Sequence, residues 1–160
     1  MKSTFLMPPG AASRPQACGP GLSPWQLRAA RIGAIALANP VHAPYGQAAR
    51  AALQSAGLWD EVSARVVVGD SVRQALQLVE SGNADVGLVS HALALASTLP
   101  ATKLDDSLYP PLWQALAVCG TERLNEASAF ARFLTSSTAQ DILRSAGFSP
   151  PPSVSTGSTR

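Results

Sequence analysis

Short apolar runs alternate with segments of helical spacing along most of the chain. Residues 31–38 (RIGAIALA) are typical of a buried strand, and an Asn-Pro pair ends that run. Pro44 then predicts a helix start, because its missing N–H is not needed in the first helical turn. The helix is expected from about Tyr45 to Ala56, and Gly57 suits its C-terminus.

The same alternation continues through the rest of the body. Further strands are predicted at residues 65–68, 84–89 and 113–119. Helices are predicted from Val72 to about 81, over 91–98, and in two segments between Asn125 and Gly147, the second capped by Ser136. Residues 100–111 are expected to be a polar linker. This order of strands and helices predicts an α/β fold with a mostly parallel sheet flanked by helices.

Proline, glycine and serine gather at the two ends of the chain. We therefore expect a disordered or extended leader at residues 1–30, an α/β lobe with C-terminal helices at 31–148, and a disordered tail at 149–160. Lys2 supplies a positive charge at the start, but Thr4–Met7 is too short for the apolar region of a standard signal peptide.

Composition and charge exclude several classes of protein. The 160 residues suffice for one domain, and 46% hydrophobic against 14% charged residues is too apolar for a disordered chain. Seven basic and ten acidic residues lie between Ile32 and Phe148, so the body carries −3 although the whole chain is +2. That balance argues against a nucleic-acid partner. No apolar run approaches the roughly 18 residues of a membrane span.

The motifs of common enzymes are missing from the sequence. It has no phosphate loop, no dinucleotide fingerprint and no nucleophile elbow, and Ser90-His91 lacks a recognisable third catalytic group. Two cysteines and two histidines leave little for a metal centre. Cys119 is expected as a packed thiol in a strand, and Asp105-Asp106 as a solvated turn. We therefore predict no enzyme, no cofactor and no metal ion.

Two loops each follow a predicted strand and open a predicted helix. They are residues 39–46 and 69–72. Ligands of open α/β sheets bind beyond the carboxyl ends of the strands, where helix N-termini present N–H groups and a positive partial charge. Two such ends aimed at one place would form an anion site. On local features alone, however, ordinary helix starts are the more common explanation.

Four segments resemble the molybdate-binding proteins of bacterial ABC transporters. They are RIGAIALANPVHAPYGQAARAALQSAGLWDEV, VVVGDSVRQALQLVESGNADVGLVS, DSLYPPLWQALAV and AFARFLTSSTAQDILRSAGF, which together span about Arg31 to Phe148. The resemblance implies a type 2 periplasmic-binding-protein fold, in which two α/β lobes close on a tetrahedral oxyanion. This chain matches the second lobe, so it is expected to be incomplete relative to the two-lobe fold.

The resemblance also implies a site and a function. Molybdate or tungstate would be held by uncharged donors, with Tyr45 and the N–H of Val72 at the two loops, and Ser90 where some members place a tyrosine. Asp70 is expected to turn its carboxylate toward its own helix as a cap. The implied function is the substrate-binding component of a molybdate or tungstate importer, with an inner-membrane permease as partner. The implied location is the periplasm. Because no standard signal peptide is seen, a cytoplasmic location is the alternative.

Departures from the family set further expectations. Nothing in residues 1–30 resembles the first lobe, so we expect a truncated protein that binds weakly or not at all alone. The segment 91–107 looks compressed, with a strand of the family missing or altered, and the last two helices would lack a partner for their apolar faces. An alternative is a cytoplasmic oxyanion-sensing module of a regulator. The sequence does not determine whether the ligand is molybdate or tungstate, nor does it determine the oligomeric state.

Overall fold

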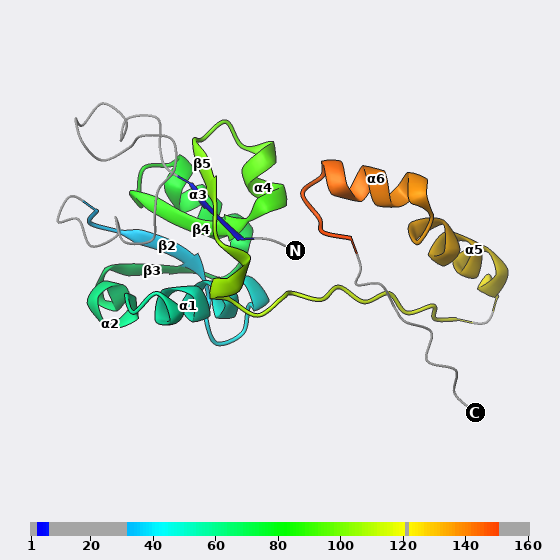
Figure 1. The fold of residues 1–160 in the computed structure, drawn as a ribbon, viewed down its shortest axis with the longest axis horizontal. Helices are drawn as coiled ribbons and strands as arrows, with labels where there is room; N and C mark the ends of the chain where they lie inside the picture. The colour runs from blue at the N-terminus through cyan, green and yellow to red at the C-terminus, as the bar shows by residue number, and fades with distance from the viewer. Residues whose placement is uncertain (1–2, 7–31, 121, 151–160) are drawn as a thin grey trace. The chain divides into compact units, whose positions relative to one another are not determined.

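The computed structural model describes residues 3–6, 32–120 and 122–150, which fall into two compact units (Figure 1). The first unit ends at Trp113 and contains a β-sheet with its helices, whereas the second begins at Gln114 and contains two helices. Most of the predicted leader, and the predicted tail from residue 151 onward, lie outside the described residues.

One five-stranded sheet forms the centre of the first unit. In spatial order its strands are β3 (Val66–Gly69), β2 (Ile35–Ala38), β4 (Val86–Ser90), β1 (Ser3–Leu6) and β5 (Ala101–Lys103). β2 pairs in parallel with β3 and β4, whereas β1 is antiparallel to β4 and β5. All strands of this sheet except β1 therefore run the same way, which confirms the predicted α/β fold with a mostly parallel sheet.

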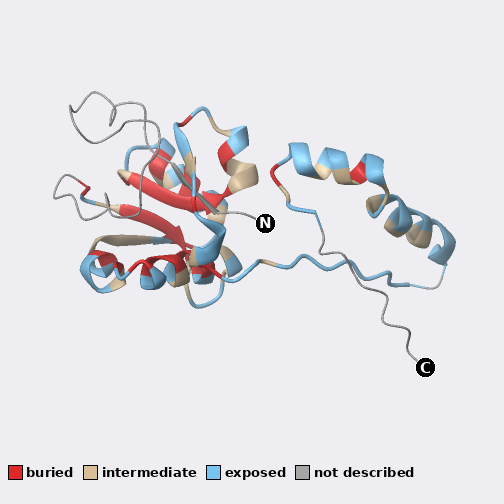
Figure 2. Cartoon of the chain, viewed as in Figure 1, coloured by how far each residue is buried: buried red, intermediate tan, exposed pale blue. Residues whose placement is uncertain are grey.

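Two apolar cores cover the two faces of this sheet. Because side chains alternate between faces along a strand, Ile35 and Leu37 belong to one core and Ala36 to the other. The first core is covered by α1 (Pro44–Ser55) and α2 (Trp59–Val62), and the 3-10 turn η3 (Ser63–Arg65) follows α2. The second core is covered by α3 (Val72–Glu80) and α4 (His91–Ala96). Figure 2 shows the buried β2 and β4 between these layers.

The ends of α1 agree with the prediction, whereas the start of β2 does not. α1 begins at Pro44, and Gly57 follows it at φ +65, a left-handed conformation that glycine adopts without steric cost. Both ends of this helix were predicted within a residue. β2, in contrast, begins four residues later than predicted. The carboxylate of Asp85 accepts the N–H groups of Gly33 at 2.7 Å and Ala34 at 2.9 Å, so these donors do not join the strand ladder.

Part of the predicted leader belongs to the sheet. Ser3–Leu6 pairs with β4 on one side and with β5 on the other, so the expectation that residues 1–30 stay outside the lobe is wrong for this segment. Four residues gave too short an apolar run to predict a strand. These residues form a strand because they pair with the edge of β4, which lies some eighty residues further along the chain.

The predicted polar linker contains two regular elements. Residues 100–111 include β5, at one edge of the sheet, and the 3-10 turn η4 (Asp106–Leu108). The predicted polar linker therefore contains a strand and a 3-10 turn that were not predicted. Within this compressed segment a strand is present, although it is only three residues long.

The strand predicted at 113–119 is absent. Residues 110–120 form no regular element, and the side chains of Trp113 and Leu116 are more than half exposed. An apolar run becomes a strand only where a neighbouring strand completes its hydrogen bonds, and none of the described residues pairs with this run. The prediction of a packed Cys119 fails for the same reason, because this cysteine is exposed.

The second unit consists of α5 (Leu124–Leu134) and α6 (Ser137–Ser145). Ser136 caps α6 by accepting the N–H of Ala139, as predicted. Large apolar side chains on these helices are exposed, among them the stacked rings of Phe130 and Phe133. That these helices lack a partner for their apolar faces stays a prediction.

Candidate functional site

Three parallel strands end at the same edge of the sheet. Ala38 lies opposite Gly69 in the register of β2 and β3, and β4 ends at Ser90. A helix follows each of these ends: α1 after β2, α3 after β3 and α4 directly after β4. The predicted site residues Tyr45, Val72 and Ser90 therefore all belong to helix starts at this one edge.

The loop between β2 and α1 is fixed by its own hydrogen bonds. Asn39 accepts the N–H of Val41 on its side-chain oxygen at 2.8 Å and the N–H of Ala43 on its carbonyl at 2.9 Å. The N–H of Asn39 donates to the carbonyl of Gly69 at 2.8 Å, which ties this loop to the end of β3. The two loops singled out from the sequence are thus joined directly.

Gly46 allows α1 to start close against the end of β2. A Cβ at this position would lie 2.3 Å from the carbonyl oxygen of Ala38 and 2.4 Å from that of Asn39. Both atoms belong to the backbone and cannot move aside as a flexible side chain would. The glycine of the Pro-Tyr-Gly sequence is therefore required by packing, and it sets how near Tyr45 comes to the strand ends.

Tyr45 is hydrogen-bonded to the side chain of Ser90 at this edge. Burial raises the pKa of the half-buried Tyr45 phenol from 10.0 to about 12, while a hydrogen bond with the Ser90 side chain lowers it and nearby Tyr109 raises it. The folded lobe therefore holds this proton more tightly than the unfolded chain. The resulting stability is complete below pH 10 and is lost as the pH rises toward 12. Near neutral pH the hydroxyl is an uncharged donor.

Ser90 is buried although its side chain is polar. Only 3% of the residue is exposed, and its hydroxyl accepts the N–H of Leu93 at 3.3 Å as the N-cap of α4. The same side chain is the hydrogen-bond partner of Tyr45. The predicted hydroxyl at this position is present, and it lies next to the other predicted loop residue. Because forty-five positions separate the two residues, their pairing could not be predicted from local spacing.

The first turn of α3 carries N–H groups with no partner among the described residues. Ser71 caps the helix by accepting the N–H of Gln74 at 3.2 Å, and the Gln74 side chain accepts the N–H of Asp70 at 2.6 Å. The N–H groups of Val72 and Arg73 precede the first helical hydrogen bond. The prediction that the Asp70 carboxylate caps this helix is wrong, because Ser71 has the better-placed oxygen.

Neutral donors and helix ends are therefore the chemistry that this edge offers. The N-cap of α1 is Ala43, which supplies no side-chain cap, so this helix start is also left without a competing side-chain oxygen. Within the described part of the chain, no group of three His, Cys, Asp or Glu side chains could hold a metal ion. None of the described helices has the length and apolar character needed to cross a membrane.

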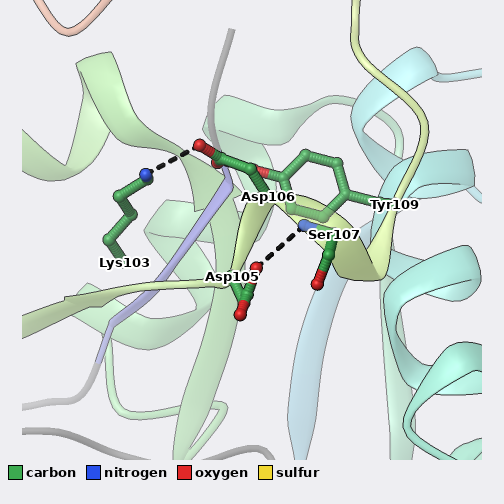
Figure 3. Close-up of polar contacts among 5 residues, drawn as sticks. All are labelled: Lys103, Asp105, Asp106, Ser107 and Tyr109. Atoms are coloured by element: carbon green, nitrogen blue, oxygen red, sulfur yellow. Dashed lines mark hydrogen bonds and ion pairs between the residues drawn. The ribbon is translucent and has the colours of Figure 1, made fainter.

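A polar chain beside this edge was not predicted from the sequence. The hydroxyl of Tyr109 donates to one oxygen of Asp106 at 3.1 Å, and Lys103 donates to the other at 2.8 Å (Figure 3). The carboxylate of Asp105 has another partner, because it accepts the N–H of Ser107 at 2.9 Å. This hydrogen bond is the main cause that lowers the pKa of Asp105. The predicted turn is exposed, but its two carboxylates have separate partners.

Comparison with known proteins identifies relatives that are named as binding proteins. The model of the family described as bacterial extracellular solute-binding protein matches residues 2–149. The chain is similar to the molybdate-binding protein ModA of Escherichia coli, with 34% identity over 119 residues, 72% of this chain and 46% of that protein. It is also similar to ModA of Rhodobacter capsulatus, with 30% identity over 116 residues, 71% of this chain and 46% of that protein.

A solved structure resembles the fold. It is the periplasmic molybdate-binding protein of Azotobacter vinelandii, with a TM-score of 0.75 and 29% identity, covering 94% of this chain and 65% of that one. The chain spans about half the length of the curated relatives it matches. The resemblance found in the sequence is confirmed, and the family match extends it through most of the segment expected to be an unrelated leader.

Proposed function

Since the chain belongs to the bacterial extracellular solute-binding protein family, we propose that it is part of the substrate-binding component of a molybdate or tungstate importer. The observation that carries this proposal is the meeting of two helix starts and a Tyr45–Ser90 hydroxyl pair at one sheet edge. The ligand would be a tetrahedral oxyanion, and the N–H of Val72 would be one of its donors.

Uncharged donors suit the task of such a protein. A helix N-terminus favours a negative charge through its partial positive charge and its free N–H groups. Hydroxyls and N–H groups also have fixed directions, so they can select an anion by its size and shape. Because no opposite full charge holds the ion, it can be released again to a partner. This mechanism consists of binding and delivery, without bond-making, so we propose no enzymatic activity and no cofactor.

The partner and the place of action follow from the same proposal. A substrate-binding protein of this kind delivers its ion to a membrane permease, so we propose an inner-membrane ABC permease as the partner. We propose the periplasm as its location, in keeping with the named location of the Azotobacter vinelandii protein. The chain spans about half the length of its curated relatives. We propose that the described loops supply only part of the cage.

Calorimetric titration of the purified chain with molybdate tests this proposal, with sulfate and phosphate as controls. We expect weak binding that favours molybdate over both controls, because the two helix starts and the hydroxyl pair form only one side of the cage. Tight, stoichiometric binding would contradict the proposed incompleteness. A folded sample that releases the same heat with sulfate as with molybdate would contradict the proposed ligand.

A further inference from the structure

We propose that Gln74 is a positioning residue of the candidate anion site, because its uncharged side chain holds the loop before α3 and leaves the start of that helix open to a negative ion. The proposal rests on the proposed function for its effect on the ligand. Its effect on the loop can be measured in the protein without any anion.

Gln74 is tied to the loop between β3 and α3 by its main chain and by its side chain. Its N–H donates to the hydroxyl oxygen of Ser71 at 3.2 Å, and its side-chain oxygen accepts the N–H of Asp70 at 2.6 Å. Ser71 and Gln74 thus form a reciprocal arrangement of the capping-box type, in which the glutamine reaches one residue further back than usual. Two successive residues of the loop are therefore held by one residue of the first helical turn.

The first turn of α3 also packs directly on the end of β3. A Cβ on Gly69 would lie 3.2 Å from the Cβ of Gln74 and 2.9 Å from the nitrogen of Ala75. The carbonyl of Gly69 accepts the N–H of Asn39 at 2.8 Å, and Asn39 belongs to the loop before α1. Gln74 therefore lies beside the junction of the two loops of the candidate site, so its hydrogen bonds fix the second loop close to the first.

These contacts decide which N–H groups remain for a ligand. The N–H of Asp70 is occupied by Gln74, and that of Gln74 is occupied by Ser71. Within the described part of the chain, the N–H groups of Ser71, Val72 and Arg73 have no acceptor. Three successive donors, held on both sides by the hydrogen bonds of Gln74, are what this helix start offers to an anion.

The charge of Gln74 matters as much as its hydrogen bonds, because a glutamate could make the same bond to Asp70. Capping boxes use glutamate or glutamine at this position, and a carboxylate in the first turn is favourable for a helix. The first turn of α3 has no acidic residue, and the exposed side chains of Asp70 and Arg73 have opposite charges. A carboxylate at position 74 would make this segment negative and would oppose an oxyanion. Glutamine supplies the acceptor without that charge.

The first part of the test measures the exchange of backbone amides with water by NMR in the ligand-free protein. Gln74→Ala removes the acceptor of the Asp70 N–H, so this amide should exchange about tenfold faster than in the parent, the value of roughly one hydrogen bond. Gln77→Ala is the matched control. Gln77 lies one turn further along α3, and its exposed side chain has no hydrogen bond within the described residues. The Asp70 amide should exchange in Gln77→Ala as it does in the parent.

The second part compares Gln74→Glu with Gln77→Glu by thermal unfolding and by calorimetric titration with molybdate. Gln74→Glu keeps the acceptor and adds a negative charge to the first turn. We expect an unfolding temperature at least as high as that of the parent, together with a molybdate affinity lowered about fivefold or more. High salt should reduce this loss, because it screens the repulsion. Gln77→Glu places the same charge beyond the first turn, where the effect of the helix end has faded, and should keep the affinity of the parent.

Gln74→Glu that binds molybdate as tightly as the parent, or Gln77→Glu that loses as much affinity, would overturn the proposal. So would an Asp70 amide that exchanges equally fast in Gln74→Ala and in the parent. A parent that binds no oxyanion would refute the proposed function, and with it the role of Gln74 in binding. The exchange of the Asp70 amide would then still decide whether Gln74 holds the loop.

Discussion

Replacing Gly46 by alanine is expected to destabilise the lobe by about 3 kcal/mol, a typical cost of overpacking a tight contact. The new methyl group would lie 2.3 Å and 2.4 Å from two backbone oxygens, so the start of α1 must move away from the end of β2. The same substitution inside an ordinary helix stabilises by about 1 kcal/mol, so the expected sign is opposite to that of helix propensity. Thermal unfolding should show a midpoint lowered by about 10 °C.

Gly57→Ala provides the matched control for this prediction. Gly57 has φ +65, but no atom lies within 4 Å of the position of a new Cβ, so its replacement meets only backbone strain of about 1 kcal/mol. The lobe should therefore tolerate Gly57→Ala better than Gly46→Ala. If Gly46→Ala unfolds at or above the temperature of the parent, α1 does not start as close to β2 as described.

Replacing Val72 by proline is expected to weaken oxyanion binding about tenfold or more while the lobe stays folded. Proline is well tolerated at the first position of a helix, and Ser71 already has the extended conformation that precedes proline. The substitution removes the N–H that would bind the anion, and a hydrogen bond to a charged group contributes about 1.5 to 3 kcal/mol. Calorimetric titration with molybdate measures the loss, and thermal unfolding checks the fold.

The side chain of Val72 requires its own control, because it is half-buried and packs against the second core. Val72→Ala shortens that side chain and keeps the N–H. Molybdate affinity should be near that of the parent in Val72→Ala and clearly lower in Val72→Pro. Equal affinities in the two variants would show that this N–H is not a donor to the anion.

Local sequence features predicted the elements whose limits are set locally. Pro44 marks the start of α1 because it lacks an N–H, and Gly57 follows its end because glycine adopts the left-handed conformation. Ser136 caps α6 because its side-chain hydroxyl reaches the first turn of the helix. Each of these effects acts within a few residues of the chain. The three residues of the predicted site came from the family resemblance instead, and in the structure each lies at or beside a helix start on this one edge. Their role as anion donors stays a prediction until binding is measured.

Features that depend on distant partners were missed or misassigned. Ser3–Leu6 is a strand because β4 and β5 offer it two edges, and residues 113–119 are not a strand because no described strand pairs with them. The Tyr45–Ser90 hydrogen bond joins helix starts on different strands, and Tyr109 reaches the same region from η4. No spacing along the chain encodes such contacts, since they appear only when the sheet assembles.

The most direct measurement of the central claim is an NMR titration of the backbone amides with molybdate, with sulfate as the control. The account predicts saturable shifts that are largest for the amides of Tyr45 and Val72, with much smaller shifts when sulfate is added. Such a result would place the oxyanion at the two helix starts. Shifts confined to other parts of the lobe, or shifts of the same size with sulfate, would contradict the claim that this edge is a molybdate site.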